Sequence, residues 1–259
     1  MRTLVHLSDL HFGRVDHSVA DALSELLGRL NPHVVAVSGD FTQRARRSQF
    51  RQARAFLDSL PRPQIVVPGN HDIPLYNLLA RALSPLGSYK RHITPDLQPV
   101  HTDAELAVLG MNTTQPKSHK GGAVSDNDLQ RVCGVLGGLG DEVVKVVVGH
   151  HPFDDTAAVE RMVTAGADVF LTGHLHVTYA GHTAERYDVG GRSAIVVEAG
   201  TATSTRMRGE ANAFNLLHID REQIVVEHFE WQSAQRTFAA GDVTRFERTS
   251  SGWSTSSRS

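Results

Sequence analysis

The stretch LVHLSDLHFG, residues 4–13, joins an apolar run to an acid and a histidine. Its apolar residues Leu4, Val5 and Leu7 are typical of a buried strand. The run then ends in Asp9 and His11 instead of the usual turn residues, such as glycine, proline or asparagine. The sequence therefore predicts a strand whose carboxyl end brings a carboxylate and an imidazole to one place.

Four later apolar runs also end in polar groups that can bind a metal ion. They are residues 34–37 before Gly39-Asp40, 65–67 before Gly69-Asn70-His71-Asp72, 143–148 before Gly149-His150-His151, and 169–171 before Gly173-His174-Leu175-His176. The glycine before each group permits unusual backbone angles and close approach of loops. Because the carboxyl ends of parallel strands lie at one edge of a sheet, we expect these groups to converge on one rim.

The pattern between and after these runs sets the fold class. Helical spacing of apolar residues predicts helices near residues 19–30, 48–60, 75–83, 126–136 and 157–165, and residues 106–109 read as a further strand. The last third changes to strands at 193–197, 214–219 and 224–229. We therefore expect an α/β fold that begins as βαβ units and ends as a β meander, with two sheets packed face to face and helices outside.

Length and composition indicate an ordinary globular protein. The 259 residues suffice for a sizeable core, and the formal net charge of −2 gives no field that would attract nucleic acid or acidic membranes. We find no signal peptide and no membrane-spanning apolar run, which predicts a cytoplasmic protein. We expect one domain over residues 1–248 and a disordered tail at 249–259, because RTSSGWSTSSRS is rich in serine and has little to bury.

The polar groups at the strand ends form a set of oxygen and nitrogen ligands without a thiolate. They are Asp9, His11, Asp40, Asn70, His150, His174 and His176. Such a set suits Mn²⁺, Fe, Zn²⁺ or Co²⁺, and it is too large for one ion. We therefore expect two divalent metal ions that share a carboxylate, activate a bridging hydroxide and stabilise charge on phosphoryl oxygens.

These five blocks, in this order, resemble the calcineurin-like metallophosphoesterases over residues 1–205. The stretches SGDFTQRA, VPGNHD and GTATSTR are similar to the branch that contains bacterial cyclic-nucleotide phosphodiesterases. The resemblance implies a four-layer α-β-β-α sandwich of two mixed sheets flanked by helices. It also implies a small phosphate-ester substrate.

The resemblance further implies a role for each residue. Asp9, His11 and His176 would hold one ion, Asn70, His150 and His174 the other, and Asp40 would bridge them. His71 would act as general acid on the leaving oxygen, and Asp72 would orient His71. On extended backbone, the spacing of His174 and His176 would put both rings on one side, about 7 Å apart.

Further residues are candidates for substrate contact or for structure. Arg44, Asn112, Arg206 and Arg208 are candidates for contact with the substrate. His151 either supports the ligands or packs beside Pro152. Cys133 lies in a helical pattern that favours a core position, and as the single cysteine it excludes a disulfide framework.

Several functions remain open within this chemistry. The first is a phosphodiesterase acting on a small substrate, for example a cyclic nucleotide, and the alternative is a phosphomonoesterase or nucleotide pyrophosphatase. The net charge and the lack of a basic stripe or DNA-capping domain argue against a nuclease. The intact Asn70-His71-Asp72 block argues against a non-enzymatic scaffold, since scaffolds of this fold have lost such residues. The edge strands of the meander could pair in a homodimer.

Overall fold

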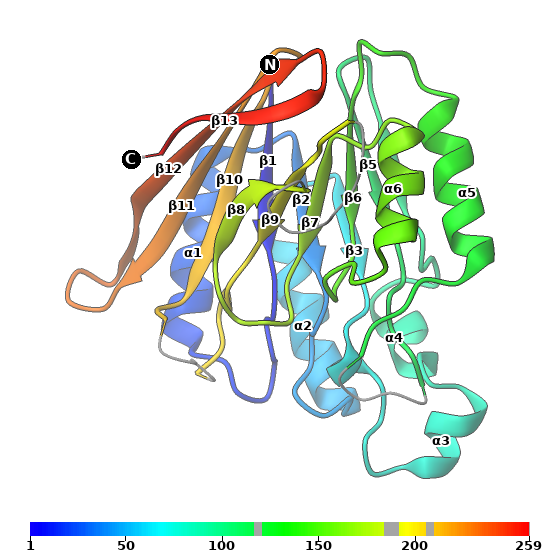
Figure 1. The fold of residues 1–259 in the computed structure, drawn as a ribbon. Helices are drawn as coiled ribbons and strands as arrows, with labels where there is room; N and C mark the ends of the chain where they lie inside the picture. Colours follow the sequence, from blue (N-terminus) through cyan, green and yellow to red (C-terminus); the bar gives the residue numbers. More distant parts are fainter. Residues whose placement is uncertain (117–120, 184–191, 206–209, 259) are drawn as a thin grey trace.

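Two mixed β-sheets form the centre of the molecule (Figure 1). The computed structural model describes residues 1–116, 121–183, 192–205 and 210–258. The first sheet has the order β13 (Gly252–Arg258), β12 (Thr237–Thr249), β11 (Gln223–Gln232), β10 (Ala213–Ile219), β1 (Arg2–Leu7), β2 (Val34–Ser38) and β3 (Gln64–Val67). The second has the order β4 (Val100–Thr102), β5 (Leu106–Gly110), β6 (Val144–Val148), β7 (Val169–Thr172), β9 (Ile195–Glu198) and β8 (Tyr179–His182).

Helices cover the outer faces of both sheets. The helices α1 (His17–Leu30), α2 (Arg47–Ser59) and α4 (Gly87–His92) pack on the first sheet, and α5 (Asp126–Gly137) and α6 (Thr156–Thr164) on the second (Figure 1). Successive strand residues serve different layers: Leu4 faces the second sheet, whereas Val5 faces the helices. This explains why the strands are continuous apolar runs, since both of their faces are buried. The predicted four-layer sandwich is confirmed.

Local capping explains where the helices begin. Ser125 caps α5 by accepting a hydrogen bond from the backbone N–H of Asp128, as its sequence pattern predicts. The helix α3 (Leu78–Leu83) is shorter than the predicted 75–83, because Asn77 caps it through the N–H of Ala80. None of the helices in the described ranges is long and apolar enough to cross a lipid bilayer.

The predicted disordered tail at 249–259 is wrong for the residues that the structure describes. Residues 252–258 form β13, which pairs antiparallel with β12. Trp253 is 1% exposed, its indole N–H donates to Asp168 at 3.0 Å, and the Arg248 guanidinium lies 4.4 Å from its ring centroid. One buried aromatic side chain thus anchors a strand whose other residues are mostly serine and threonine.

The carboxyl ends of the parallel strands meet at the lower edge of the sandwich in Figure 1. In the first sheet, β1, β2 and β3 run parallel, and in the second β5, β6, β7 and β9 do so. Hydrogen bonds join the loops beyond these ends, from Asp9 N to Gly39 O at 3.2 Å and from Gly173 N to His150 O at 2.9 Å. The two sheets therefore deliver their loops to a common rim, as the sequence predicts.

The anchoring role of Trp253 can be tested by stability. We expect Trp253→Ala to lower the free energy of unfolding by about 3–5 kcal/mol, because it removes a buried aromatic side chain. The exposed neighbour Ser254 supplies the control, Ser254→Ala, which should cost less than about 0.5 kcal/mol. Urea denaturation measures both, and equal stability of the two variants would show that β13 does not hold the C-terminus.

Candidate metal centre

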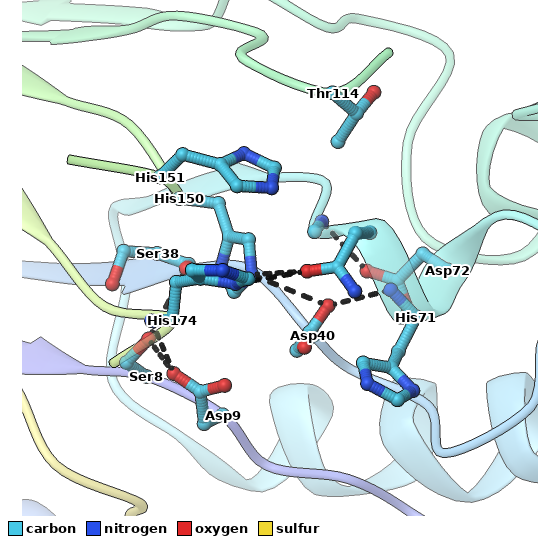
Figure 2. Close-up of polar contacts among 12 residues, drawn as sticks. Ser8, Asp9, Ser38, Asp40, His71, Asp72, Thr114, His150, His151 and His174 are labelled. Carbon is cyan, nitrogen blue, oxygen red and sulfur yellow. Dashed lines mark hydrogen bonds and ion pairs between the residues drawn. The ribbon is translucent and has the colours of Figure 1, made fainter. Parts of the chain in front are cut away.

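Side chains from both sheets point into one space beyond the strand ends. Figure 2 shows Asp9 and Asp40 from the first sheet directed toward His150 and His174 from the second. Two hydrogen bonds tie the sheets together here. His174 N donates to Asp9 Oδ2 at 2.9 Å, and His150 Nδ1 donates to the carbonyl oxygen of Ser38 at 2.7 Å. The site therefore lies across the junction of the two sheets.

Most of the predicted metal ligands lie on left-handed backbone. The φ angles are 54° at Asp9, 51° at His11, 54° at Asp40, 70° at His174 and 61° at His176. The expectation of extended backbone at His174 and His176 is therefore wrong. Non-glycine residues rarely adopt this conformation, and where they do it is often at functional sites. The left-handed residues follow β1, β2 and β7, where they turn the chain sharply and direct their side chains into the site.

Two glycines before the polar groups serve different purposes. Gly39 has a φ of +89°, so it uses the backbone freedom that the sequence predicts. Gly69 has ordinary backbone, and its role is close approach. A Cβ atom there would lie 2.1 Å from Asp40 Oδ1 and 2.3 Å from Asp40 N. The absence of a side chain at Gly69 lets the loops after β2 and β3 touch.

Asp9, His11 and His176 form the first group of candidate ligands. Asp9 Oδ1 lies 3.0 Å from His176 Nε2 and 3.4 Å from His11 Nε2, and the two histidine nitrogens are 3.3 Å apart. Ser8 donates a hydrogen bond from its hydroxyl to the other oxygen of Asp9 at 2.7 Å. All three ligand atoms are buried and close enough to share one ion.

Asn70, His150 and His174 form the second group. Asn70 Oδ1 lies 3.1 Å from His150 Nε2 and 3.0 Å from His174 Nδ1. His151 stands beside this group, with its ring centroid 4.6 Å from that of His174. Its Nδ1 is 3.0 Å from the hydroxyl of Thr113, which leaves both of the sequence-based alternatives for His151 open.

Asp40 lies between the two groups. Its Oδ2 is 3.8 Å from His11 Nε2, and its Oδ1 is 3.4 Å from His150 Nε2. The backbone N–H of His71 donates to Oδ1 at 2.8 Å, which fixes the carboxylate in place. One carboxylate with an oxygen directed at each group is the arrangement that a bridging ligand needs.

The electrostatics of the site show strong coupling between acids and imidazoles. Burial opposes ionisation of Asp9 and Asp40, but the neighbouring histidines hold the pKa values of both carboxyls below their ordinary range. Burial would lower the pKa of His150, yet Asp40 raises it to about 9. Burial and the charge of His150 lower the pKa of His174 to about 4. His174 is thus a neutral imidazole with a lone pair to offer at neutral pH.

The donor set fits a pair of divalent cations. Because His150 Nδ1 donates to a carbonyl, the lone pair of a neutral His150 lies on Nε2, which faces the oxygens of Asp40 and Asn70. Acceptors that face acceptors repel unless a cation or a proton lies between them. Asp9 Oδ1 is likewise buried and accepts no well-aligned hydrogen bond. Cations at these two positions would satisfy both sets of lone pairs.

The hydrogen bonds of His71 and Asp72 show how each side chain is held. His71 Nδ1 donates to the backbone carbonyl of Gln43 at 3.0 Å. The carboxylate of Asp72 instead accepts hydrogen bonds from the backbone N–H groups of Gly69, Phe41 and Thr42, at 3.0, 3.2 and 2.9 Å. Burial and the nearby Asp40 raise the pKa of Asp72 to about 7. Asp72 therefore fixes the loops that carry Asp40 and His71, and Gln43 fixes the ring.

The remaining predicted residues lie in different places. Arg44 is exposed, with its guanidinium 5.4 Å from the ring centroid of Tyr76. Asn112 is half-buried, and its side-chain oxygen accepts hydrogen bonds from Thr114 N at 3.0 Å and Thr114 Oγ1 at 2.8 Å. Arg206 and Arg208 lie outside the described residues.

Two supporting residues were missed from the sequence. Gln43 acts through its backbone carbonyl, a group that every residue has, so no sequence signal marks it. Thr113 uses its hydroxyl to accept from the N–H groups of His150 and His151, at 3.3 and 3.1 Å, and nothing near it in the sequence indicates this.

Comparison with known proteins agrees with this geometry. The family profile of the calcineurin-like phosphoesterases matches residues 2–178. The chain belongs to this family. The match includes every candidate ligand and both His71 and Asp72, so the family resemblance drawn from the sequence is confirmed.

Individual relatives extend the comparison. The chain is 31% identical over 166 residues to the glycerophosphodiester phosphodiesterase GpdQ of Enterobacter lignolyticus, and the matched region is 58% of this chain and 56% of GpdQ. The fold is similar to that of purple acid phosphatase PPD1 from yellow lupin, with a TM-score of 0.66, 12% identity and coverage of 92% of this chain and 52% of that one. A predicted phosphoesterase of Streptococcus pneumoniae gives a TM-score of 0.50 at 15% identity, covering 95% and 98% of the two chains.

The close approach at Gly69 yields a test of the site that leaves every candidate ligand in place. We expect Gly69→Ala to abolish binding of at least one of two manganese ions, because the new Cβ would displace Asp40. The control is Gly134→Ala in α5, where a Cβ meets nothing within 4 Å and alanine favours the helix.

Inductively coupled plasma mass spectrometry of the manganese-loaded protein gives the number of manganese ions per chain. Circular dichroism shows whether each variant is folded. A folded Gly69→Ala variant with the manganese content of the wild type would contradict the placement of Asp40.

Proposed function

We propose that this protein is a metal-dependent phosphoesterase that hydrolyses phosphodiester bonds of a small substrate, a cyclic nucleotide being one candidate. The observation that carries the proposal is Asp40, whose two oxygens face two separate groups of candidate ligands. The relative GpdQ, named as a glycerophosphodiester phosphodiesterase, supports a diester as substrate.

The proposed ligand sets follow the two groups in the structure. Asp9, His11 and His176 would hold one divalent cation, Asn70, His150 and His174 the other, and Asp40 would bridge them. Mn²⁺, Fe, Zn²⁺ and Co²⁺ all suit such ligands. When bound, two such cations supply a water of lowered pKa and stabilise negative charge on phosphoryl oxygens.

His71 is the proposed general acid. Its Nδ1 is held by the carbonyl of Gln43, and its ring centroid lies 5.0 Å from that of His11, so the imidazole stands at the border of the first ligand group. Figure 2 shows His71 beside Asp40 but pointing away from the second ligand group. This position suits proton transfer to a leaving oxygen, with Asp72 fixing the loop beneath it.

Removal of the bridging carboxylate tests the ligand assignment. We expect Asp40→Ala to lose both manganese ions, because each group then lacks a shared anionic ligand. Asp21→Ala, at an exposed position in α1, is the control and should keep both ions. Isothermal titration calorimetry with manganese measures the number of bound ions and their affinity in each variant. A folded Asp40→Ala protein that still binds two ions with wild-type affinity would refute the bridge.

Leaving-group dependence tests the role of His71. We expect His71→Ala to slow esters with poor alkoxide leaving groups by roughly 10²–10⁴ and p-nitrophenolate esters much less, because a good leaving group needs no proton. His17→Ala, an exposed histidine at the start of α1, is the control. Equal losses on both kinds of ester would rule out general-acid catalysis by His71.

The reaction class itself is tested with two chromogenic esters. We expect manganese-loaded protein to hydrolyse bis(p-nitrophenyl) phosphate faster than p-nitrophenyl phosphate, and chelator to stop both reactions. Preference for the monoester would replace the proposal with a phosphomonoesterase. Turnover of neither ester would favour a non-enzymatic role.

A further inference from the structure

A pocket lined by arginines opens beside the candidate metal centre. Its volume is about 470 Å³, and it is lined by Gly13, Arg14, Gln43, Arg44, Arg46 and Gln49. Each of the three arginines is exposed, and among the residues that the structure describes no acid lines the pocket. The pocket therefore presents concentrated positive charge in a protein whose net charge is slightly negative.

Backbone contacts connect this arginine pocket to the reaction centre. Gln43 lines the pocket, and its carbonyl accepts the hydrogen bond from the His71 ring at 3.0 Å. Arg14 follows the ligand His11 and donates its backbone N–H to the His11 carbonyl at 2.8 Å. The arginine pocket therefore adjoins the loops that carry His11 and His71.

The backbone of the pocket is fixed. The buried Gln49 accepts hydrogen bonds at its side-chain oxygen from Arg44 N at 2.9 Å and Arg46 N at 3.4 Å. The carbonyl of Arg14 accepts hydrogen bonds from Thr205 N at 2.7 Å and Thr205 Oγ1 at 3.0 Å. The arginine side chains therefore project from held positions, which reduces the entropy lost when they bind a ligand.

The positive charges of the pocket arginines are not neutralised by carboxylates of the residues that the structure describes. Elsewhere Arg2, Arg54 and Arg192 form ion pairs with carboxylates. No carboxylate oxygen of the described residues lies within 4.0 Å of a side-chain nitrogen of the three pocket arginines. In addition, α2 begins directly after Arg46 and has no acid in its first turn, so its dipole adds to the positive potential.

We infer that the arginine pocket binds a second anionic group of the substrate, remote from the phosphoryl group that is cleaved. This inference rests on the proposed phosphodiesterase function and narrows its substrate class. The preferred substrates are small phosphodiesters that carry a further phosphate or carboxylate. Guanidinium groups bind both oxyanions through paired hydrogen bonds, and such pairs are strong when the partner is charged.

A matched series of esters tests the inference. The probes are p-nitrophenyl phosphodiesters whose second alcohol is glycerol, glycerate or glycerol phosphate, which differ in the charge of the remote group. We expect the manganese-loaded enzyme to favour at least one charged ester over the glycerol ester by about tenfold in kcat/KM, chiefly through KM. Preference for the glycerol phosphate ester assigns a phosphate to the pocket, and preference for the glycerate ester assigns a carboxylate.

Substitutions of pocket residues test whether the arginines cause the preference for charged esters. We expect Arg14→Ala and Arg46→Ala each to reduce the preference for the charged ester by roughly fivefold or more. The preference is the kcat/KM of the charged ester divided by that of the glycerol ester. Arg51→Ala is the control, since Arg51 is exposed on α2 and does not line the pocket. High salt should also reduce the ratio.

The inference and the proposed function fail in different ways. Equal kcat/KM for all three esters in the wild type, or an unchanged ratio in both pocket variants, would overturn the inference while the enzyme remains a phosphodiesterase. Turnover of no ester would overturn the proposed function. The pocket would then be tested by titration calorimetry of the same esters with metal-free protein, where equal affinities for the charged and neutral esters would overturn the inference.

Discussion

The structure depends on one electrostatic constraint: carboxylates and imidazoles from two sheets are held close together at the junction of the sheets. Asp9 and Asp40 supply buried carboxylate oxygens, the buried His150 supplies a ring nitrogen, and the half-buried His174 supplies another. A buried carboxylate oxygen without a well-aligned hydrogen bond, such as Asp9 Oδ1, is costly in a protein interior. Divalent cations at this site would offset the cost, and ions that bind only the folded chain would stabilise it.

The fold satisfies this constraint with loops of irregular backbone that directly follow regular strands. The strands are buried on both faces and hold the loop ends rigidly, while left-handed residues after β1, β2 and β7 carry five of the candidate ligands. Backbone of this kind persists only where its surroundings hold it. Hydrogen bonds between loops, such as those of Asp72 to the backbone of Gly69 and Thr42, provide that support. The geometry of the site thus depends as much on these supporting groups as on the ligands.

Much of this could be predicted from the sequence because apolar runs and polar strand ends are local patterns. The helix after Ser125 and the convergence of Asp40 and His150 follow from capping chemistry and from the order of strands. Other features could not be predicted. The strand at Trp253 depends on a contact with Asp168, far away in the chain, and the support of His71 comes from a backbone carbonyl. Both are tertiary contacts that no local pattern encodes.

The measurement that tests the account most directly is anomalous diffraction from crystals of the manganese-loaded protein. We expect two manganese peaks about 3.5–4 Å apart on either side of the Asp40 carboxylate, one beside His11 and the other beside His150. A single peak, or two peaks that do not share Asp40, would contradict the account.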